Sequence, residues 1–338
     1  FNLPDSSIVD GSENFNTVLY PGSNSTQSIT GVGFSPNFVW MKNRTSAANN
    51  ILMDTIRGGT KFVEANTAAA ETTVSGLLTF DTDGFSPLGG AFGINAAGSN
   101  YVAWNWKAGG TAVTNTDGDI TTLVSANPTA GFSIVTFTGT GVITDTIGHG
   151  LGTAPEMLFL RGRSIGSGWF TYNKTIGNGK FMYLNTTQAE ITSSGVWNST
   201  SPTSTVFVTG GASAGVTMVA YCFASVEGYS KIGSYTGNGS ADGPFVYTGF
   251  RPAFIMIKLT GSIAGYGDWR LLDASRNTYN VVNSALSAND SAAENANNSA
   301  FNTDFLSNGF KIKTTYNDLN ASGQTYIYMA FAENPFKN

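Results

Sequence analysis

Charge is scarce in this sequence, and so are cysteine, histidine and long hydrophobic runs. Charged residues make up 12% of the 338 positions, against roughly 25% in an ordinary soluble domain. The formal net charge is -5, and no cluster of Lys and Arg is present that could neutralise phosphates, which argues against a nucleic-acid-binding protein. The longest largely apolar run, residues 216–224, is far shorter than the roughly 20 residues that cross a bilayer. We therefore expect neither nucleic-acid binding nor membrane insertion.

The single cysteine and the single histidine limit the possible chemistry further. Cys222 has no partner for an internal disulfide, and we expect it to be a small buried residue within a strand. His149 stands between two glycines, four positions after Asp145. One histidine and one distant cysteine do not make a zinc site, and no Gly-x-Ser-x-Gly motif accompanies the histidine. His149 is predicted to hydrogen-bond in a loop or between modules, and no metal or cofactor is predicted.

Two acidic pairs are the remaining candidates for catalysis or cation binding. They are Asp81 with Asp83 and Asp117 with Asp119, both beside a glycine in turn sequences. Paired carboxylates can hydrolyse glycans, but Asp in such turns commonly accepts hydrogen bonds from nearby backbone. The spacing resembles part of a calcium loop, yet the complete twelve-residue loop with its closing Glu is missing, which leaves a weak calcium site as an alternative. We assign no catalytic residue and expect that the protein is not an enzyme.

What the sequence does contain is a threefold internal repeat. One landmark is a proline followed by a free position, four apolar residues and a base, and it recurs at residues 36–42, 155–161 and 252–258. Another is an apolar residue, alanine and an aromatic residue, which recurs at residues 102–104, 219–221 and 329–331. The landmarks keep their order and, between the first two copies, nearly the same spacing. A repeat of this length indicates tandem structural modules.

Within each copy, short segments rich in Val, Ile, Phe, Tyr, Trp and Thr alternate with Gly, Asn, Asp and Pro, which is typical of strands and turns. We predict an all-β protein of three tandem β-sandwich modules, jelly-roll-like and related by the internal repeat. The predicted order is an N-terminal lead segment (1–14), module 1 (15–110), a linker with one short hairpin (111–131), module 2 (132–228) and module 3 (229–338).

Further features of the repeat predict where the core lies. The apolar segment after each proline lacks polar alternation, which favours a strand covered on both faces or lying at a module interface. The aromatic segment that closes each module, such as residues 326–331, is expected in the core, and truncation after Gly323 is expected to unfold module 3 alone. Only residues 65–71 and 290–297 could form short helical turns.

Exposed aromatic rings are the last candidate for ligand contact, because Trp and Tyr provide contact area at a low entropic cost. Trp169 and Trp269 occupy matched positions in modules 2 and 3, which favours a core role for both. Trp197 is not constrained by the repeat and is followed by polar residues. It is therefore our candidate ligand-binding residue.

Four stretches carry a resemblance to a known family: residues 31–44, 101–110, 148–155 and 227–239. They resemble a repeat-containing β domain of tailed-bacteriophage virion proteins, found in marine and freshwater phages and labelled as tail fibre or as uncharacterised. The similarity runs along nearly the whole chain from Phe15 onward. It implies a virion component on the extracellular particle surface, in the tail or the capsid, and it offers no catalytic residue to carry over.

The function expected from residues and resemblance together is that of a phage structural protein. A tail-fibre or receptor-binding component would attach the particle to a host-surface glycan or protein, and its other partners would be virion proteins and further copies of itself, with a homotrimer as the usual arrangement for fibres. One alternative is a capsid fibre or decoration protein with a purely structural role. Another, less favoured, is a glycan depolymerase.

Overall fold

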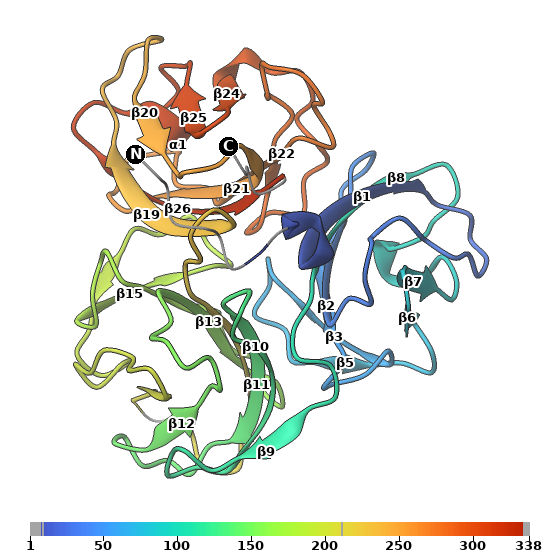
Figure 1. The fold of residues 1–338 in the computed structure, drawn as a ribbon, viewed down its shortest axis with the longest axis vertical. Coiled ribbons are helices and arrows are strands. Elements are labelled where there is room, and N and C mark those ends of the chain that lie inside the picture. The colour runs from blue at the N-terminus through green and yellow to red at the C-terminus, as the bar shows by residue number, and fades with distance from the viewer. Residues whose placement is uncertain (1–7, 9, 211, 334–338) are drawn as a thin grey trace.

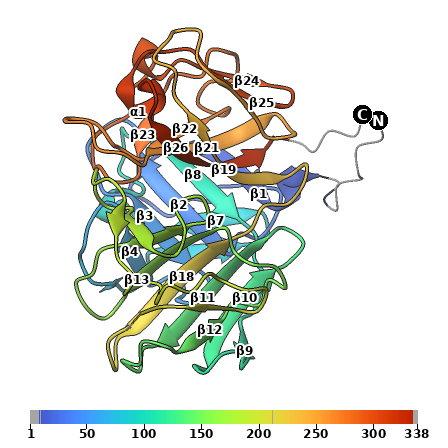
Figure 2. The same ribbon diagram turned by 90° about the vertical axis from the view of Figure 1, so that its left-hand side faces the viewer.

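The computed structural model describes residues 8, 10–210 and 212–333, and strands account for almost all of its regular structure (Figure 1). The strands form three lobes around a common centre, and Figure 2 shows the same arrangement from the side. We call strands β1–β8 the first lobe, β9–β18 the second and β19–β26 the third. The prediction of an all-β protein is confirmed. Among the described residues, no helix is both long and apolar enough to cross a bilayer.

Each lobe is built on one large antiparallel sheet. The neighbouring strands of the first are β1 (Phe15–Pro21), β8 (Asn100–Trp106), β2 (Phe38–Asn43), β3 (Ile51–Asp54), β4 (Lys61–Glu64) and β5 (Thr72–Thr73). Those of the second are β9 (Val113–Asn115), β10 (Thr122–Asn127), β11 (Phe132–Thr138), β18 (Thr217–Phe223), β13 (Met157–Gly162), β14 (Phe170–Asn173), β15 (Lys180–Tyr183) and β16 (Ile191–Thr192). Those of the third are β19 (Ser230–Thr236), β26 (Thr325–Ala332), β21 (Pro252–Leu259), β22 (Arg270–Asp273) and β23 (Leu286–Ser287).

A small sheet accompanies the large sheet in every lobe. The small sheets contain β6 (Leu78–Asp81) and β7 (Gly84–Pro87); β12 (Thr146–Gly148) and β17 (Val206–Val208); and β20 (Phe245–Tyr247), β25 (Gly309–Ile312) and β24 (Thr303–Leu306). In the described residues, helical structure is limited to η1 (Gly11–Glu13), η2 (Ala91–Gly93), η3 (Ser299–Phe301) and α1 (Asn317–Asn320). The helical turns allowed at residues 65–71 and 290–297 are not formed, because both segments are loops that dock on a neighbouring lobe.

The strand after each proline is buried on both faces, as its lack of alternation predicted. In β2, Phe38 and Trp40 belong to a central core that all three lobes share. Val39 and Met41 point the other way, into a core that belongs to the first lobe alone. Strands β13 and β21 divide their side chains in the same manner. Each of these strands has two apolar faces because it lies between two cores, and the closing strands β8, β18 and β26 divide their side chains in the same way.

The closing strand of each lobe brings one aromatic ring to the centre of the molecule. The rings are those of Trp106, Phe223 and Phe331, and all three pairs are in contact edge to face. The centroids of Trp106 and Phe331 are 5.7 Å apart, and Phe223 is 6.2 Å from each of the other two. Residues 326–331 are thus core, as predicted, and β26 lies inside its sheet between β19 and β21.

Strand pairing corrects the alignment of the third copy. Phe38, Met157 and Phe254 occupy the same place after their prolines, and their partners are Trp106, Phe223 and Phe331. Counting back from these rings, the residue equivalent to Ala103 and Ala220 is Tyr328, and Ala330 lies two positions further on. The alanine motif therefore aligns the third copy two positions out of register. This shift is hard to detect in the sequence, because alternate residues of a strand lie on the same face and have similar side chains.

Residues 111–131, expected as a linker, contribute to the second lobe. Their strands β9 and β10 extend its large sheet beyond β11, with Val124 paired to Val135. The hairpin expected in this segment is present, but it is part of the sheet.

Candidate functional site

The residues with reactive side chains are held by structural hydrogen bonds. His149 is fully buried, and its Nδ1 accepts the N–H of Leu151 at 3.2 Å. Nε2 therefore carries the proton and donates to the Thr203 carbonyl, also at 3.2 Å. Burial lowers the pKa of His149, although the Thr203 carbonyl and the charge of Asp117 oppose the shift. The neutral imidazole thus links two loops of the second lobe. Of the two predicted roles, the hydrogen bond within a loop region is confirmed, and these bonds do not cross between lobes.

One carboxylate of each acidic pair holds the backbone of a loop that is distant in sequence, and the other, Asp81 or Asp117, accepts hydrogen bonds from nearby side chains. Asp83 accepts the backbone N–H groups of Gly31 and Gly33 at 3.1 and 2.6 Å, and these bonds lower the pKa of its carboxyl group. Asp119 accepts the hydroxyl and the N–H of Thr146 at 2.7 and 3.0 Å, with the same effect on its pKa. Within the described ranges, no group of three or more His, Cys, Asp or Glu side chains could hold a metal ion.

Trp197 does not present its ring to a ligand. The side chain is 1% exposed, its ring packs edge to face on Tyr172, and its Nε1 donates to the Lys180 carbonyl at 3.1 Å. Our expectation of an exposed ring here was wrong, because neighbouring polar residues say nothing about what covers a side chain. Cys222 is buried in β18 as expected, and burial raises the pKa of its thiol to about 12.

Each lobe inserts one buried base into a loop of its neighbour. The bases end the proline landmark of each copy and are Lys42, Arg161 and Lys258. Lys42 of the first lobe donates to the Ser291 carbonyl of the third at 2.7 Å. Arg161 of the second lobe donates to the Glu64 carbonyl of the first at 3.0 Å, and Lys258 of the third donates to the Thr187 carbonyl of the second at 3.0 Å. The bonds run in one direction around the centre and close a ring.

A second set of cross-lobe bonds follows the same direction but is incomplete. Trp104 donates to Asp273 of the third lobe at 3.0 Å, and Tyr221 donates to Asp54 of the first at 2.8 Å. At the third interface the equivalent residues are Met329 and Asn173, and methionine has no hydrogen to donate. The Nδ2 of Asn173 is buried without a hydrogen-bond partner in the described part of the chain. At this position two interfaces have a buried polar pair, whereas the third has none and relies on other cross-lobe bonds, such as that of Lys258.

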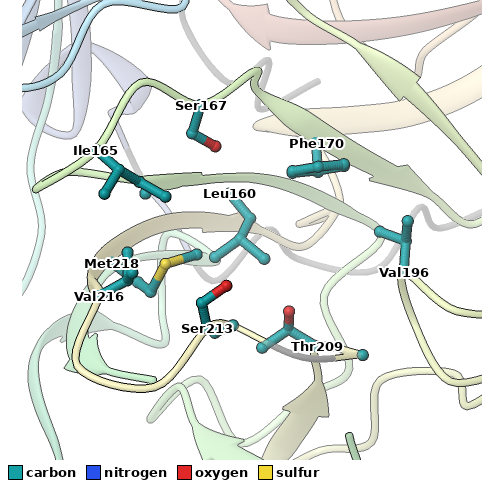
Figure 3. Close-up of a pocket in the computed structure, with 12 residues that line it drawn as sticks. Leu160, Ile165, Ser167, Phe170, Val196, Thr209, Ser213, Val216 and Met218 are labelled. Atoms are coloured by element: carbon teal, nitrogen blue, oxygen red, sulfur yellow. The ribbon is translucent and has the colours of Figure 1, made fainter. Parts of the chain in front are cut away.

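A pocket lies in the second lobe, between the large sheet and the loops that cover it (Figure 3). Its volume is about 260 Å³. Ile165, Ser167 and Phe170 lie on one side and Thr209 and Ser213 on the opposite side. The lining further includes Leu160, Gly162, Val196, Gly210, Ala212, Val216 and Met218. It has three hydroxyl groups and no titratable side chain, so it can enclose an apolar group but offers neither an acid nor a base.

Comparison of the lobes explains why this space is open. In the first lobe Tyr101 stacks on Tyr20 at 5.1 Å, and its hydroxyl accepts the N–H of Ala96. In the third, Tyr326 stacks on Tyr235 at 5.0 Å and accepts the N–H of Ala321. Strand pairing places Met218 at the equivalent position of the second lobe. Its side chain lacks the ring and the hydroxyl that fill this space in the other lobes. The sequence therefore contains an indication of this pocket: Met218 stands where the other two copies have a tyrosine.

Comparison with known proteins gives one match. A family model described as Domain of unknown function (DUF7483) matches residues 10–335. No curated protein matches the chain, and no solved structure does either.

Proposed function

This chain belongs to the family described as Domain of unknown function (DUF7483), and because that description assigns no activity, we propose a function from the chain's own residues. We propose that it is a structural protein of a tailed-bacteriophage virion, a tail-fibre or receptor-binding component that displays loops for attachment to the host surface. The resemblance of its repeated segments to phage virion proteins supports this origin. A location on the outside of the particle, in the tail, is part of the proposal.

The main observation that supports the display of loops is the ring of buried hydrogen bonds between the lobes. Lys42, Arg161 and Lys258 fix each lobe to the next, and the shared aromatic centre removes any hinge between lobes. A charge or polar group buried at an interface is costly unless it is paired, so these contacts select a single relative placement of the lobes. Loops on such a body keep fixed positions, which suits attachment through several weak contacts at once.

The structural use of His149, Asp83 and Asp119 supports a role without catalysis. A glycan depolymerase would need two carboxyl groups facing one groove, whereas these carboxylates are occupied by turn backbone and a threonine. Each lobe pairs a large sheet with a small one, which supports our proposal that the lobes are jelly-roll-like sandwiches. We further propose that the partners are other virion proteins and additional copies of the chain.

The threefold arrangement favours one second candidate, a capsid decoration protein. A single chain with three similar lobes around one centre matches a site of threefold symmetry, because similar lobes can make similar contacts on three sides. Such a protein would have no host ligand.

Localisation on the particle separates the two candidates. Cryo-electron microscopy of intact particles, with antibody labelling of this chain, is expected to place it at the tail. Purified protein added in excess is then expected to slow adsorption of the phage to its host. Density on the capsid would overturn the attachment role, and absence of the chain from particles would overturn both.

A further inference from the structure

The outer face of the small sheet in the third lobe differs from those in the other two lobes. The middle residue of β20, Val246, pairs with Phe310 of β25, and both are buried. Its neighbours Phe245 and Tyr247 point outward and are 45% and 57% exposed. Two adjacent aromatic rings therefore lie open to solvent on one face of a strand.

The other lobes show that the fold does not need these rings. Ile29 pairs with Phe85 in the first lobe, as Val246 does with Phe310. The residues on either side of Ile29 are Ser28 and Thr30, both exposed. In the second lobe Ile147 pairs with Phe207, and its neighbours are Thr146 and Gly148. The inward residue is thus apolar in all three lobes, whereas at the two flanking positions only the third lobe has aromatic residues.

The residues beside the two rings include two glycines, which have no side chain to cover the rings. Gly309 pairs with Tyr247, and a Cβ atom there would lie 3.0 Å from the ring of Phe245 and 2.1 Å from the Val246 carbonyl. The ring of Phe245 therefore lies against bare backbone. A Cβ atom on Gly249 would lie 3.6 Å from the Tyr247 hydroxyl, which is an ordinary contact distance. The Phe245 ring thus covers Gly309, and together with Tyr247 it forms an exposed aromatic surface.

Charges on this face are balanced. Lys311, the partner of Phe245, pairs with Asp242 at 2.6 Å, and Lys313 pairs with Asp304 at 3.0 Å. All four side chains are at least partly exposed. Two positive and two negative groups leave no net charge to attract a charged ligand, but they offer hydrogen-bond donors and acceptors beside the rings. This arrangement complements a ligand that is uncharged, rich in hydroxyl groups and flat on one side.

We propose that the outer face of β20, β25 and β24 binds an uncharged polysaccharide, with pyranose rings stacked on Phe245 and Tyr247. The C–H face of a pyranose is apolar and its rim is polar, so it matches an aromatic ring with a polar edge. Lys311, Asp242 and Asp304 then contact the hydroxyl groups of the bound sugar. This inference rests on the proposed attachment function and names the surface and the ligand class that serve it.

The test compares the wild-type chain with Phe245→Ser/Tyr247→Thr, which copies Ser28 and Thr30 of the first lobe and should fold. Native electrophoresis is run in gels that contain dextran, laminarin or glucomannan, with alginate as the charged comparison. We expect at least one neutral polysaccharide to retard the wild-type chain, and the double variant to bind at least tenfold more weakly. Tyr279→Thr, a change at a tyrosine that is 85% exposed elsewhere in the third lobe, should bind as wild type does.

Equal retardation of wild type and double variant would overturn the proposal. So would retardation by alginate alone, or by none of the four polysaccharides. Unchanged unfolding midpoints show that any loss is local. The particle experiment is independent of this one: a chain on the tail that binds no polysaccharide refutes this inference only, whereas a chain that binds but is absent from particles refutes the attachment role.

Discussion

The hydroxyl of Tyr221, in the second lobe, donates a 2.8 Å hydrogen bond to the carboxylate of Asp54, in the first lobe. The same hydroxyl accepts a hydrogen bond from Arg57 Nη2, also at 2.8 Å. Arg57 and Asp54 form a fully buried ion pair at 2.5 Å. The phenol therefore completes a polar network that would otherwise be buried with an unsatisfied group, and the network joins two lobes.

Tyr221→Phe is expected to destabilise the chain by about 1–3 kcal/mol, because it leaves a buried donor and acceptor without their partner. Urea denaturation followed by Trp fluorescence measures the change. Tyr279→Phe removes the same atom from an 85% exposed side chain and should have no measurable effect. A Tyr221→Phe variant as stable as that control would show that the cross-lobe bond contributes nothing.

Phe331→Ala is expected to lower the stability of all three lobes together by about 3–5 kcal/mol. The ring contacts Trp106 and Phe223 at the centre, so its loss opens a cavity that every lobe lines. Truncation after Gly323, which removes β26, should for the same reason unfold the whole chain and not the third lobe alone. Calorimetry of the Phe331→Ala variant should show one transition. Separate transitions, with two lobes at their original temperature, would contradict a shared core.

Met218→Tyr is expected to fill the pocket of the second lobe and raise the free energy of unfolding by about 1 kcal/mol. The new ring would take the place that Tyr101 and Tyr326 occupy in the other lobes. The donor to its hydroxyl would be the N–H of Ser213, which is equivalent to Ala96 and Ala321. Met182→Tyr is the comparison, since Met182 is buried in the central core and an enlarged side chain there should destabilise by about 1–3 kcal/mol. If both variants lose stability alike, the pocket is not an unfilled tyrosine site.

Stability should fall by up to about 1 kcal/mol between pH 7 and pH 5.5, through His149. Burial lowers its pKa in the folded chain below the ordinary value of 6.5. The unfolded chain then binds the proton first as the pH falls, so acid favours unfolding, and stability rises again as the pH returns above 6.5. The chain has no other histidine, and His149→Gln should flatten the profile over this range. An unchanged slope in that variant would assign the effect to other groups.

The strands were predictable because their signals are local. Apolar runs, β-rich composition and turn residues lie within a few positions of one another, and the internal repeat showed which segments are equivalent. The two-faced burial of β2, β13 and β21 also followed from composition, since a strand without polar residues has no face for water. The repeat also indicated the pocket, because Met218 replaces the tyrosine that the other two copies have at this position.

Contacts between distant segments were not predictable in this way. Trp197 was predicted to be exposed because the sequence does not show that its ring packs on Tyr172 and that its Nε1 donates to the Lys180 carbonyl. The register of the third copy was misplaced by two residues because positions two apart in a strand look alike. The loops at residues 65–71 and 290–297 have no periodic signal, because their conformation is set by the lobe on which they dock.

The sequence by itself determined that this is an all-β chain built from three copies of one pattern, with little charge and with aromatic residues at the end of each copy. Only the tertiary structure decided that the copies close into a ring around Trp106, Phe223 and Phe331, with one buried base reaching from each lobe into the next. The physical reason is that strand formation follows from alternation along a few residues. Closure depends on which apolar faces meet and which buried polar groups find partners, and those partners lie more than a hundred residues away for Tyr221 and Trp104.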